Sequence, residues 1–130
     1  MAKRRFLIVD DSKFFRYTCG KYLESLDAEI VEAESGDQAL ELANKSRFDL
    51  VMSDVEMPGL NGREFCEELK KNPDTHSIPV ILISSLDSEK AIEQGFRAGA
   101  SAYLPNNITD QKIRETVHSI RDKNIRHREQ

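Results

Sequence analysis

The sequence has no tryptophan, only two cysteines and no apolar run of the ~20 residues that a membrane span requires. Cys19 and Cys66 show neither metal-ligand spacing nor a disulfide framework, so we expect both to be small buried hydrophobic side chains. The net charge is only −4 and there is no basic stripe with interleaved aromatic residues, which argues against direct binding of nucleic acid. We do not expect the start, MAKRRFLIVDD, to be a signal peptide, because its apolar run soon ends in two aspartates. We expect a cytoplasmic protein that contacts neither nucleic acid nor a membrane directly.

What the chain does contain is a balance typical of one folded domain, with 38% hydrophobic and 32% charged residues among 130. Short apolar runs alternate with amphipathic segments from end to end, and no linker, internal repeat or low-complexity segment interrupts them. We predict a single domain over residues 1–122, followed by a polar tail or the start of a linker over 123–130.

Apolar runs predict the strands of this domain. They are Phe6–Val9, Ala28–Ala33, Leu50–Met52, Pro79–Ile83 and Ala102–Leu104. The second run is more polar than the first, which favours an edge position in the sheet. Between the runs, Ser35 with Gln38 predicts a capping box, and Asp87 or Ser88, then Thr109, predict the caps of the last two helices. Strands that alternate with helices predict a parallel sheet covered by helices on both faces.

Polar residues follow four of the predicted strands at the points where those strands end. In chain order they are Asp10-Asp11, Ser53-Asp54, Ser84-Ser85 and Pro105-Asn106-Asn107. Ligands of open α/β sheets bind beyond the carboxyl ends of the strands. We therefore expect three carboxylates and the hydroxyl of Ser84 to converge at one end of the sheet.

Three carboxylates that lie close together repel one another, so we expect a cation between them. Oxygen-only ligation, completed by waters, suits Mg²⁺ better than Zn²⁺. A Mg²⁺ ion beside a carboxylate also assists phosphoryl transfer, because it neutralises charge on the transferring oxygens. In these surroundings Asp54 can act as the nucleophile that forms an acyl phosphate.

Taken singly, each of these residues has an ordinary structural interpretation. An aspartate at a strand end is often a turn residue or a helix cap, and Asp11 or Ser12 could simply cap the first helix. Ser84 alone could be no more than a small residue at a strand end. Their occurrence together at the ends of three strands favours a functional site.

With these residues identified, the sequence resembles the response-regulator receiver family over essentially its whole length. The matching segments are FLIVDDS, DLVMSDVEMPGLNG, PVILISS and AGASAYL. The resemblance implies a doubly wound, flavodoxin-like α/β fold, with a five-stranded parallel sheet of order 2-1-3-4-5 and helices on both faces. It also implies a switch that receives its phosphoryl group from a histidine kinase or a phosphotransfer protein.

The resemblance implies a role for each residue of the acidic cluster. Asp54 would be the phosphoacceptor. Asp11 and Asp54 would bind Mg²⁺ directly, together with the backbone carbonyl of Glu56, while Asp10 would act through water. Ser84 stands where the family keeps a hydroxyl that hydrogen-bonds the phosphoryl group.

The same resemblance implies how phosphorylation changes a binding surface of the domain. Tyr103 matches an aromatic residue whose inward rotation remodels the surface of the fourth helix, the fifth strand and the fifth helix. A downstream protein would bind this surface, and a homodimer is a further possibility on phosphorylation. Tyr103 is equally interpretable as a half-exposed strand aromatic, and the two interpretations are compatible.

The sequence departs from the family pattern at Asn106 and Asn107, and Glu56 is a second point of interest. Asn106 stands where the family keeps a lysine and Asn107 where it keeps a proline, so a hydrogen bond is available but no charge. A cis bond between two asparagines would cost about 2.5–4 kcal/mol, so we expect it to be trans. Glu56 flanks the path of the hydrolytic water in the family, where it could affect dephosphorylation or simply be a solvated loop carboxylate.

Two alternatives to a phosphorylated switch remain open. The first is a pseudo-receiver, an interaction module that keeps the acidic site but does not switch, and Asn106 favours it. The second is a Mg²⁺-dependent phosphohydrolase of small molecules, which would need an acid positioned to protonate the leaving group and a lid. The sequence shows no DxD nucleophile motif and no inserted cap domain, so this alternative ranks last. We expect a signalling domain rather than an enzyme, apart from its own phosphorylation and dephosphorylation.

Overall fold

The computed structural model describes the backbone of residues 4–129 and the side chains of residues 4–120. Strands and helices alternate along this part of the chain. In order they are β1 (Arg4–Val9), α1 (Lys13–Glu24), β2 (Ala28–Ala33), α2 (Gly36–Lys45), β3 (Leu50–Asp54), α3 (Gly62–Lys71), β4 (Val80–Ser84), α4 (Glu89–Arg97), β5 (Ala102–Pro105) and α5 (Asp110–Glu129). Among the described helices, none has the length and apolar character needed to span a bilayer.

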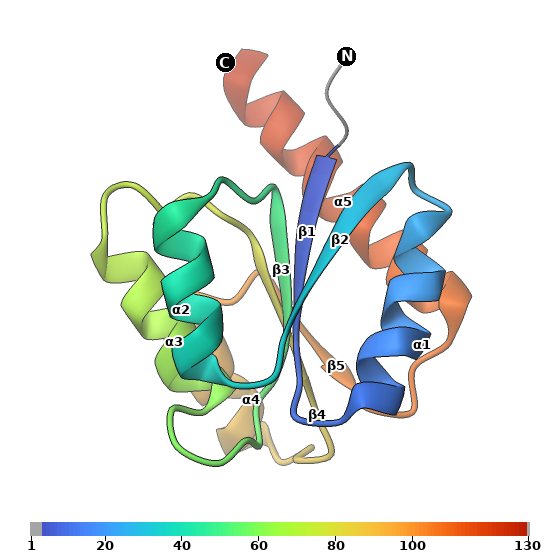
Figure 1. Ribbon diagram of the computed structural model, residues 1–130. Helices are drawn as coiled ribbons and strands as arrows, with labels where there is room; N and C mark the ends of the chain where they lie inside the picture. The colour runs from blue at the N-terminus through green and yellow to red at the C-terminus, as the bar shows by residue number, and fades with distance from the viewer. Residues whose placement is uncertain (1–3, 130) are drawn as a thin grey trace.

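The strands form one parallel sheet of order β2-β1-β3-β4-β5 (Figure 1). This confirms the predicted doubly wound α/β fold and the edge position of the second strand. The first strand lies beside the third, with Val9 opposite Ser53, and the third beside the fourth, with Asp54 opposite Ile83. The carboxyl ends of β1, β3 and β4 therefore lie side by side at the same end of the sheet.

Successive side chains of the central strands point to opposite faces and build two separate cores. On one face Leu7 and Val9 pack with the buried residues of α2 and α3, and on the other Phe6 and Ile8 pack with those of α1 and α5. Both cysteines are buried as predicted, Cys19 in the second core and Cys66 in the first. The sheet is thus held rigidly from both sides, which suits a site built at its edge.

Side-chain caps begin the helices, mostly as the sequence predicts. Ser88 caps α4, and the Thr109 hydroxyl accepts a hydrogen bond from the backbone of the first turn of α5 (3.2 Å). The predicted capping box of α2 forms only in part: Ser35 accepts from the N–H of Gln38, but the Gln38 amide oxygen accepts from Glu34 rather than from Ser35. The complete box lies at α3, between Asn61 and Glu64, where none was predicted.

Figure 1 places β1's first residue and the end of α5 at the upper end of the molecule, and the carboxyl ends of the strands at the lower end. The helix α5 continues to Glu129. The side chains of the predicted tail, 123–130, lie outside the described residues, so the boundary at residue 122 stays a prediction. All described peptide bonds are trans, as expected for Asn106–Asn107.

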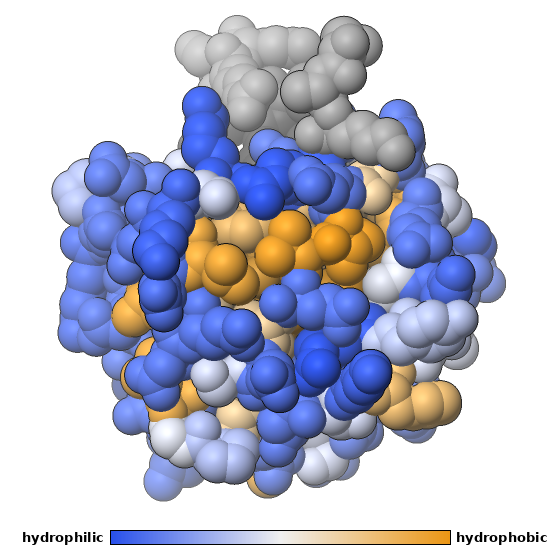
Figure 2. All heavy atoms as spheres, viewed as in Figure 1, coloured by the Kyte–Doolittle hydropathy of each residue, from blue (hydrophilic) through white to orange (hydrophobic). Residues whose placement is uncertain are grey.

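The edge strand β2 carries charged side chains. Figure 2 shows apolar side chains in a band across the face on which β2 lies, with polar side chains around it. The glutamates of β2 are both paired, Glu29 with Arg5 and Glu32 with Arg16, at 2.9 Å each. Charged side chains on an edge strand oppose pairing with a further strand, so we do not regard this edge as a binding surface.

Candidate functional site

Three aspartates meet at the carboxyl end of the sheet, which is the lower end of the sheet in Figure 1. Asp10 and Asp11 follow β1 directly, and Asp54 is the last residue of the neighbouring strand β3. One carboxylate oxygen from each lies within 4.8 Å of the other two. The structure thus brings together the carboxylates that the sequence places at the ends of two strands.

Burial and mutual repulsion disfavour the charged forms of two of these carboxylates. Asp10 is 5% exposed, and burial, reinforced by the charge of Asp11, raises its pKa. Burial and the neighbouring Asp10 raise the pKa of Asp54 from 3.8 to about 6. Backbone donors offset part of this effect, because Ser12 N–H donates to Asp10 (2.8 Å) and Glu56 N–H to Asp54 (3.3 Å).

This cluster lacks a basic partner. Within residues 4–120, no lysine, arginine or histidine forms an ion pair with Asp10, Asp11 or Asp54. An all-oxygen donor set in which the pKa values of Asp10 and Asp54 stay raised fits a hard divalent cation such as Mg²⁺. The residues present are therefore suited to the ion that the sequence predicts.

Ser84 ends β4 beside this cluster and is 2% exposed. Its hydroxyl accepts a hydrogen bond from Leu86 N–H (2.9 Å) and donates one to Glu56 Oε1 (3.3 Å). The hydroxyl of Ser85 donates to the same oxygen of Glu56 at 2.8 Å. The carboxylate of Glu56, expected to be either solvated or close to a water path, is thus bonded to two serines.

Tyr103 and Asn106 come from β5 and the turn that follows it. Tyr103 is partly exposed, and its hydroxyl donates to the carbonyl of Leu86 (2.7 Å), so it is tied to the loop that follows Ser84. Asn106 is exposed in the turn after β5. The position at which the family keeps a lysine therefore offers this site no positive charge.

A close backbone approach fixes the start of α3 beneath Asp54. Gly62 N–H donates to the carbonyl of Val55 (3.0 Å), and a β-carbon on Gly62 would collide with the backbone carbonyl of Asp54. Ser53 donates its hydroxyl to that same carbonyl (2.9 Å). Only glycine allows this contact, and the complete capping box at Asn61 begins the helix at this point.

One residue at the site, Arg16, was not predicted from the sequence. Arg16 of α1 is only 8% exposed, donates to the backbone carbonyl of Asp10 (2.6 Å) and pairs with Glu32 (2.9 Å). A signal was present, because Arg16 lies one turn after the cap Ser12 and three residues before the buried Cys19. A cation on the buried face of a helix needs a partner, and the aspartate pair was the nearest candidate in the sequence.

Comparison with known proteins bears directly on this site. The family model described as "Response regulator receiver domain" matches residues 6–118. Protein PilH of Pseudomonas aeruginosa is 34% identical over 116 residues, which cover 89% of this chain and 96% of PilH. The gliding motility regulatory protein of Myxococcus xanthus is 41% identical over 104 residues, 79% of this chain but only 13% of that protein.

Solved structures agree with the sequence comparisons. The chemotaxis protein CheY4 of Vibrio cholerae superposes with a TM-score of 0.85 at 28% identity, covering 91% of this chain and 98% of that one. A response regulator from Chloroflexus aurantiacus, described as putative in its structure's name, gives 0.83 at 28% identity, covering 93% and 97%. The likeness therefore extends over nearly the whole chain.

Proposed function

This chain belongs to the response regulator receiver family, and on that premise we propose that Asp54 accepts a phosphoryl group from a histidine kinase or a phosphotransfer protein. The observation that carries the proposal is the convergence of three carboxylates within 4.8 Å at the carboxyl edge of the sheet. In the transfer, an oxygen of Asp54 bonds to phosphorus while the bond from phosphorus to the donor's histidine nitrogen breaks.

The chain's own residues prepare this step. With a pKa of about 6, the carboxyl of Asp54 is mostly ionised at neutral pH and available as a nucleophile. Asp11, Asp54 and the backbone carbonyl of Glu56 would hold Mg²⁺ directly, and Asp10 would hold it through water. When bound, the ion neutralises charge on the transferring oxygens. The Ser84 hydroxyl then donates a hydrogen bond to the phosphoryl group, for which it is buried close by.

We propose that the output surface is the face formed by α4, β5 and α5. A groove of about 510 Å³ lies there, with Phe96, Tyr103, Lys112 and Glu115 among its lining residues. Tyr103 connects this groove to Ser84 through Leu86. A downstream protein, or a second phosphorylated copy, would bind this face. We assign residues 1–122 to this receiver domain and 123–130 to a tail, and place its action in the cytoplasm.

The test is direct phosphorylation of the chain. Incubated with a small phosphodonor such as phosphoramidate and Mg²⁺, the protein is expected to gain the mass of one phosphoryl group, and a chelator is expected to prevent it. Asp54→Asn should gain nothing, while Asp49→Asn, at the opposite end of β3, serves as the control and should react normally. Equal labelling of wild type and Asp54→Asn would overturn the proposal.

A second candidate is a pseudo-receiver, and the exposed Asn106 in place of a lysine is the observation that favours it. Beryllofluoride, a mimic of the acyl phosphate, separates the two functions when backbone amide shifts are followed in the presence of Mg²⁺. Shifts that spread through Tyr103 to α4 and α5 support a switch. Shifts confined to the strand ends support binding without switching.

A further inference from the structure

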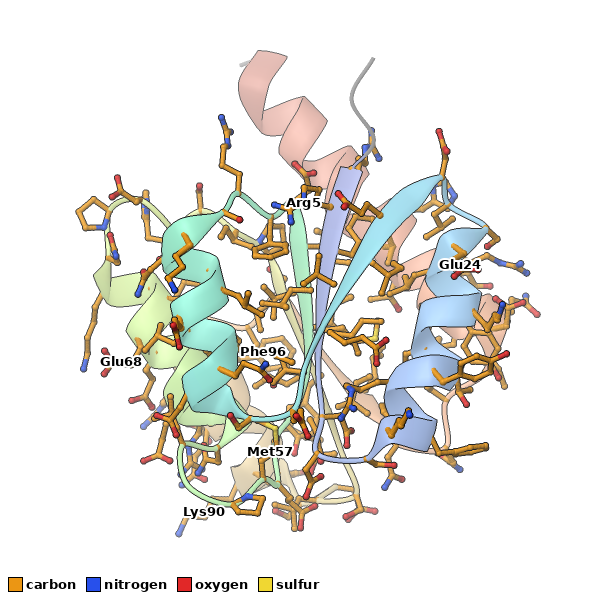
Figure 3. All side chains as sticks on the ribbon, in the orientation of Figure 1. Arg5, Glu24, Met57, Glu68, Lys90 and Phe96 are labelled. Atoms are coloured by element: carbon orange, nitrogen blue, oxygen red, sulfur yellow. The ribbon has the colours of Figure 1, made fainter. Side chains whose placement is uncertain are left out.

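The carboxylate of Glu56 joins two loops at the edge of the acidic site. Glu56 belongs to the loop after β3, and the serines that donate to its Oε1 end β4 and begin the next loop. Figure 3 labels its neighbour Met57 near the lower end of the view, where this loop lies. Ser84 and Ser85 approach the same oxygen, at 3.3 and 2.8 Å respectively. Their hydroxyls are thus held together by one acceptor.

A serine hydroxyl has a single proton to donate. In this structure Ser84 accepts from Leu86 N–H and directs its proton to Glu56. Under the proposed function, a phosphoryl group on Asp54 requires the same proton. Ser84 cannot serve both acceptors, so it must leave Glu56 when the phosphoryl group arrives.

Electrostatic repulsion opposes this change of hydrogen-bond acceptor by Ser84. A phosphoryl group adds about −1.5 to −2 charge, and Glu56 already acts on Asp54 with its own negative charge. No basic side chain within residues 4–120 forms an ion pair with Asp54. On phosphorylation, the carboxylate of Glu56 must therefore lose its hydrogen bond from Ser84 and lie beside a second anion.

We propose that Glu56 is a latch that competes with the phosphoryl group for Ser84, and that Ser85 anchors this latch. The inference rests on the proposed role of Asp54 and adds to it a positioning residue that sets how readily the phosphorylated state forms. Ser85 is the anchor because it makes the shorter bond to Glu56 and is itself exposed. Removal of Glu56 frees Ser84, and removal of Ser85 leaves Glu56 held only by the longer bond from Ser84 itself.

Because Ser84 also bonds Leu86, and Leu86 bonds Tyr103, the latch has a route to the proposed output face. The bonds run from Glu56 to Ser84, from the Ser84 oxygen to Leu86 N–H, and from the Leu86 carbonyl to the Tyr103 hydroxyl. Opening the latch is therefore expected to alter the surroundings of Tyr103 as well as the affinity of the site.

The experiment is a calorimetric titration of the full chain with beryllofluoride at saturating Mg²⁺, with Mg²⁺ affinity measured separately for each variant. Loss of a hydrogen bond worth about 0.5–1.5 kcal/mol corresponds to a change in affinity of about twofold to twelvefold. We expect Glu56→Ala and Ser85→Ala each to bind beryllofluoride more tightly by this amount. The double variant should bind no more tightly than Glu56→Ala, because both changes open one latch.

Two controls separate a latch from a simple charge effect. Glu56→Gln removes the charge but keeps an acceptor oxygen for the serines, so its gain should be smaller than that of Glu56→Ala. Ser85→Ala keeps the charge and removes only the anchor. Unchanged affinity in Ser85→Ala, together with equal gains in Glu56→Gln and Glu56→Ala, overturns the latch and leaves charge alone as the cause.

The same titration distinguishes failure of the latch from failure of the proposed function. If no variant binds beryllofluoride, the phosphoacceptor role of Asp54 is overturned, and the latch with it. If the wild type fails to bind and Glu56→Ala binds, a latch that holds Ser84 away from the site is supported. Circular dichroism of each variant confirms that the exposed positions 56 and 85 have been changed without loss of the fold.

Discussion

The aromatic ring of Tyr103 occupies the space that a side chain on Gly95 would need. A β-carbon built on Gly95 lies 2.7 Å from Cδ2 of Tyr103, closer than nonbonded carbon atoms approach. Gly95 is a buried position inside α4, where glycine weakens a helix relative to alanine. The glycine therefore lets one edge of the tyrosine ring lie against α4 while its hydroxyl reaches Leu86.

We predict that Gly95→Ala displaces the ring of Tyr103 and breaks its hydrogen bond to Leu86. The loss of the bond, about 1 kcal/mol, offsets a gain of about 1 kcal/mol in helix propensity, so the free energy of unfolding should hardly change. The ring-proton chemical shifts of Tyr103 should change strongly. Tyr103→Phe, which keeps the ring but removes the bond, should lose about 1 kcal/mol. Unaltered Tyr103 shifts in Gly95→Ala would contradict the close packing.

Arg16 is predicted to stabilise the loop that carries Asp10. Arg16→Met leaves the carbonyl of Asp10 and the carboxylate of Glu32 without their partner, so it should lower the free energy of unfolding by about 2 kcal/mol. Urea unfolding of the metal-free protein measures this loss. The matched control is Arg97→Met, whose exposed pair with Glu93 should contribute no more than about 0.5 kcal/mol. Equal losses in both variants would contradict a special role for Arg16.

Stability of the metal-free protein should depend on pH through Asp54. Its carboxyl has a pKa of about 6 in the folded chain against 3.8 for the unperturbed group. Between these values the folded chain holds more protons than the unfolded chain, so the contribution of Asp54 becomes less favourable as pH rises. We expect Asp54→Asn to be more stable than wild type by about 1 kcal/mol above pH 6, after allowance for solvent screening.

This advantage of Asp54→Asn should shrink as pH falls from about 6 towards 4, because the wild-type carboxyl then becomes protonated. Denaturant unfolding at several pH values measures it. Addition of Mg²⁺ should stabilise the wild type more than the variant, since the ion relieves the same repulsion. An advantage that grew towards acid pH would contradict the assigned cause.

A lysine introduced at position 106, after β5, should weaken the binding of the metal ion to the carboxylates. We predict that Asn106→Lys lowers the Mg²⁺ affinity of the unphosphorylated chain by about tenfold, since a positive charge near the carboxylates opposes a second cation. The same charge should lower the pKa of Asp54 from about 6. Mg²⁺ titration followed by amide shifts gives the affinity. Asn107→Lys is the control for net charge, and an equal effect of both variants would show that position 106 is not special.

The order of elements and the acidic cluster could be predicted from the sequence for a local reason. Apolar runs and helical periodicity mark strands and helices whatever surrounds them, and the carboxyl ends of parallel strands share one edge. Residues at the carboxyl ends of neighbouring strands, such as Asp10 and Asp54, must therefore meet. The relative polarity of β2 was likewise enough to place it at the edge.

The contacts that shape the site depended on packing. Glu56 meets Ser84 and Ser85 across two loops, Arg16 crosses from α1 to Glu32, and the ring of Tyr103 lies on Gly95. None of these pairs has a periodic signature, because each depends on how two elements sit against each other and which rotamer the space allows. The sequence by itself determined which groups gather at the edge of the sheet. The tertiary structure decided which of them are already bonded to one another, since a hydrogen bond depends on distances that no local pattern encodes.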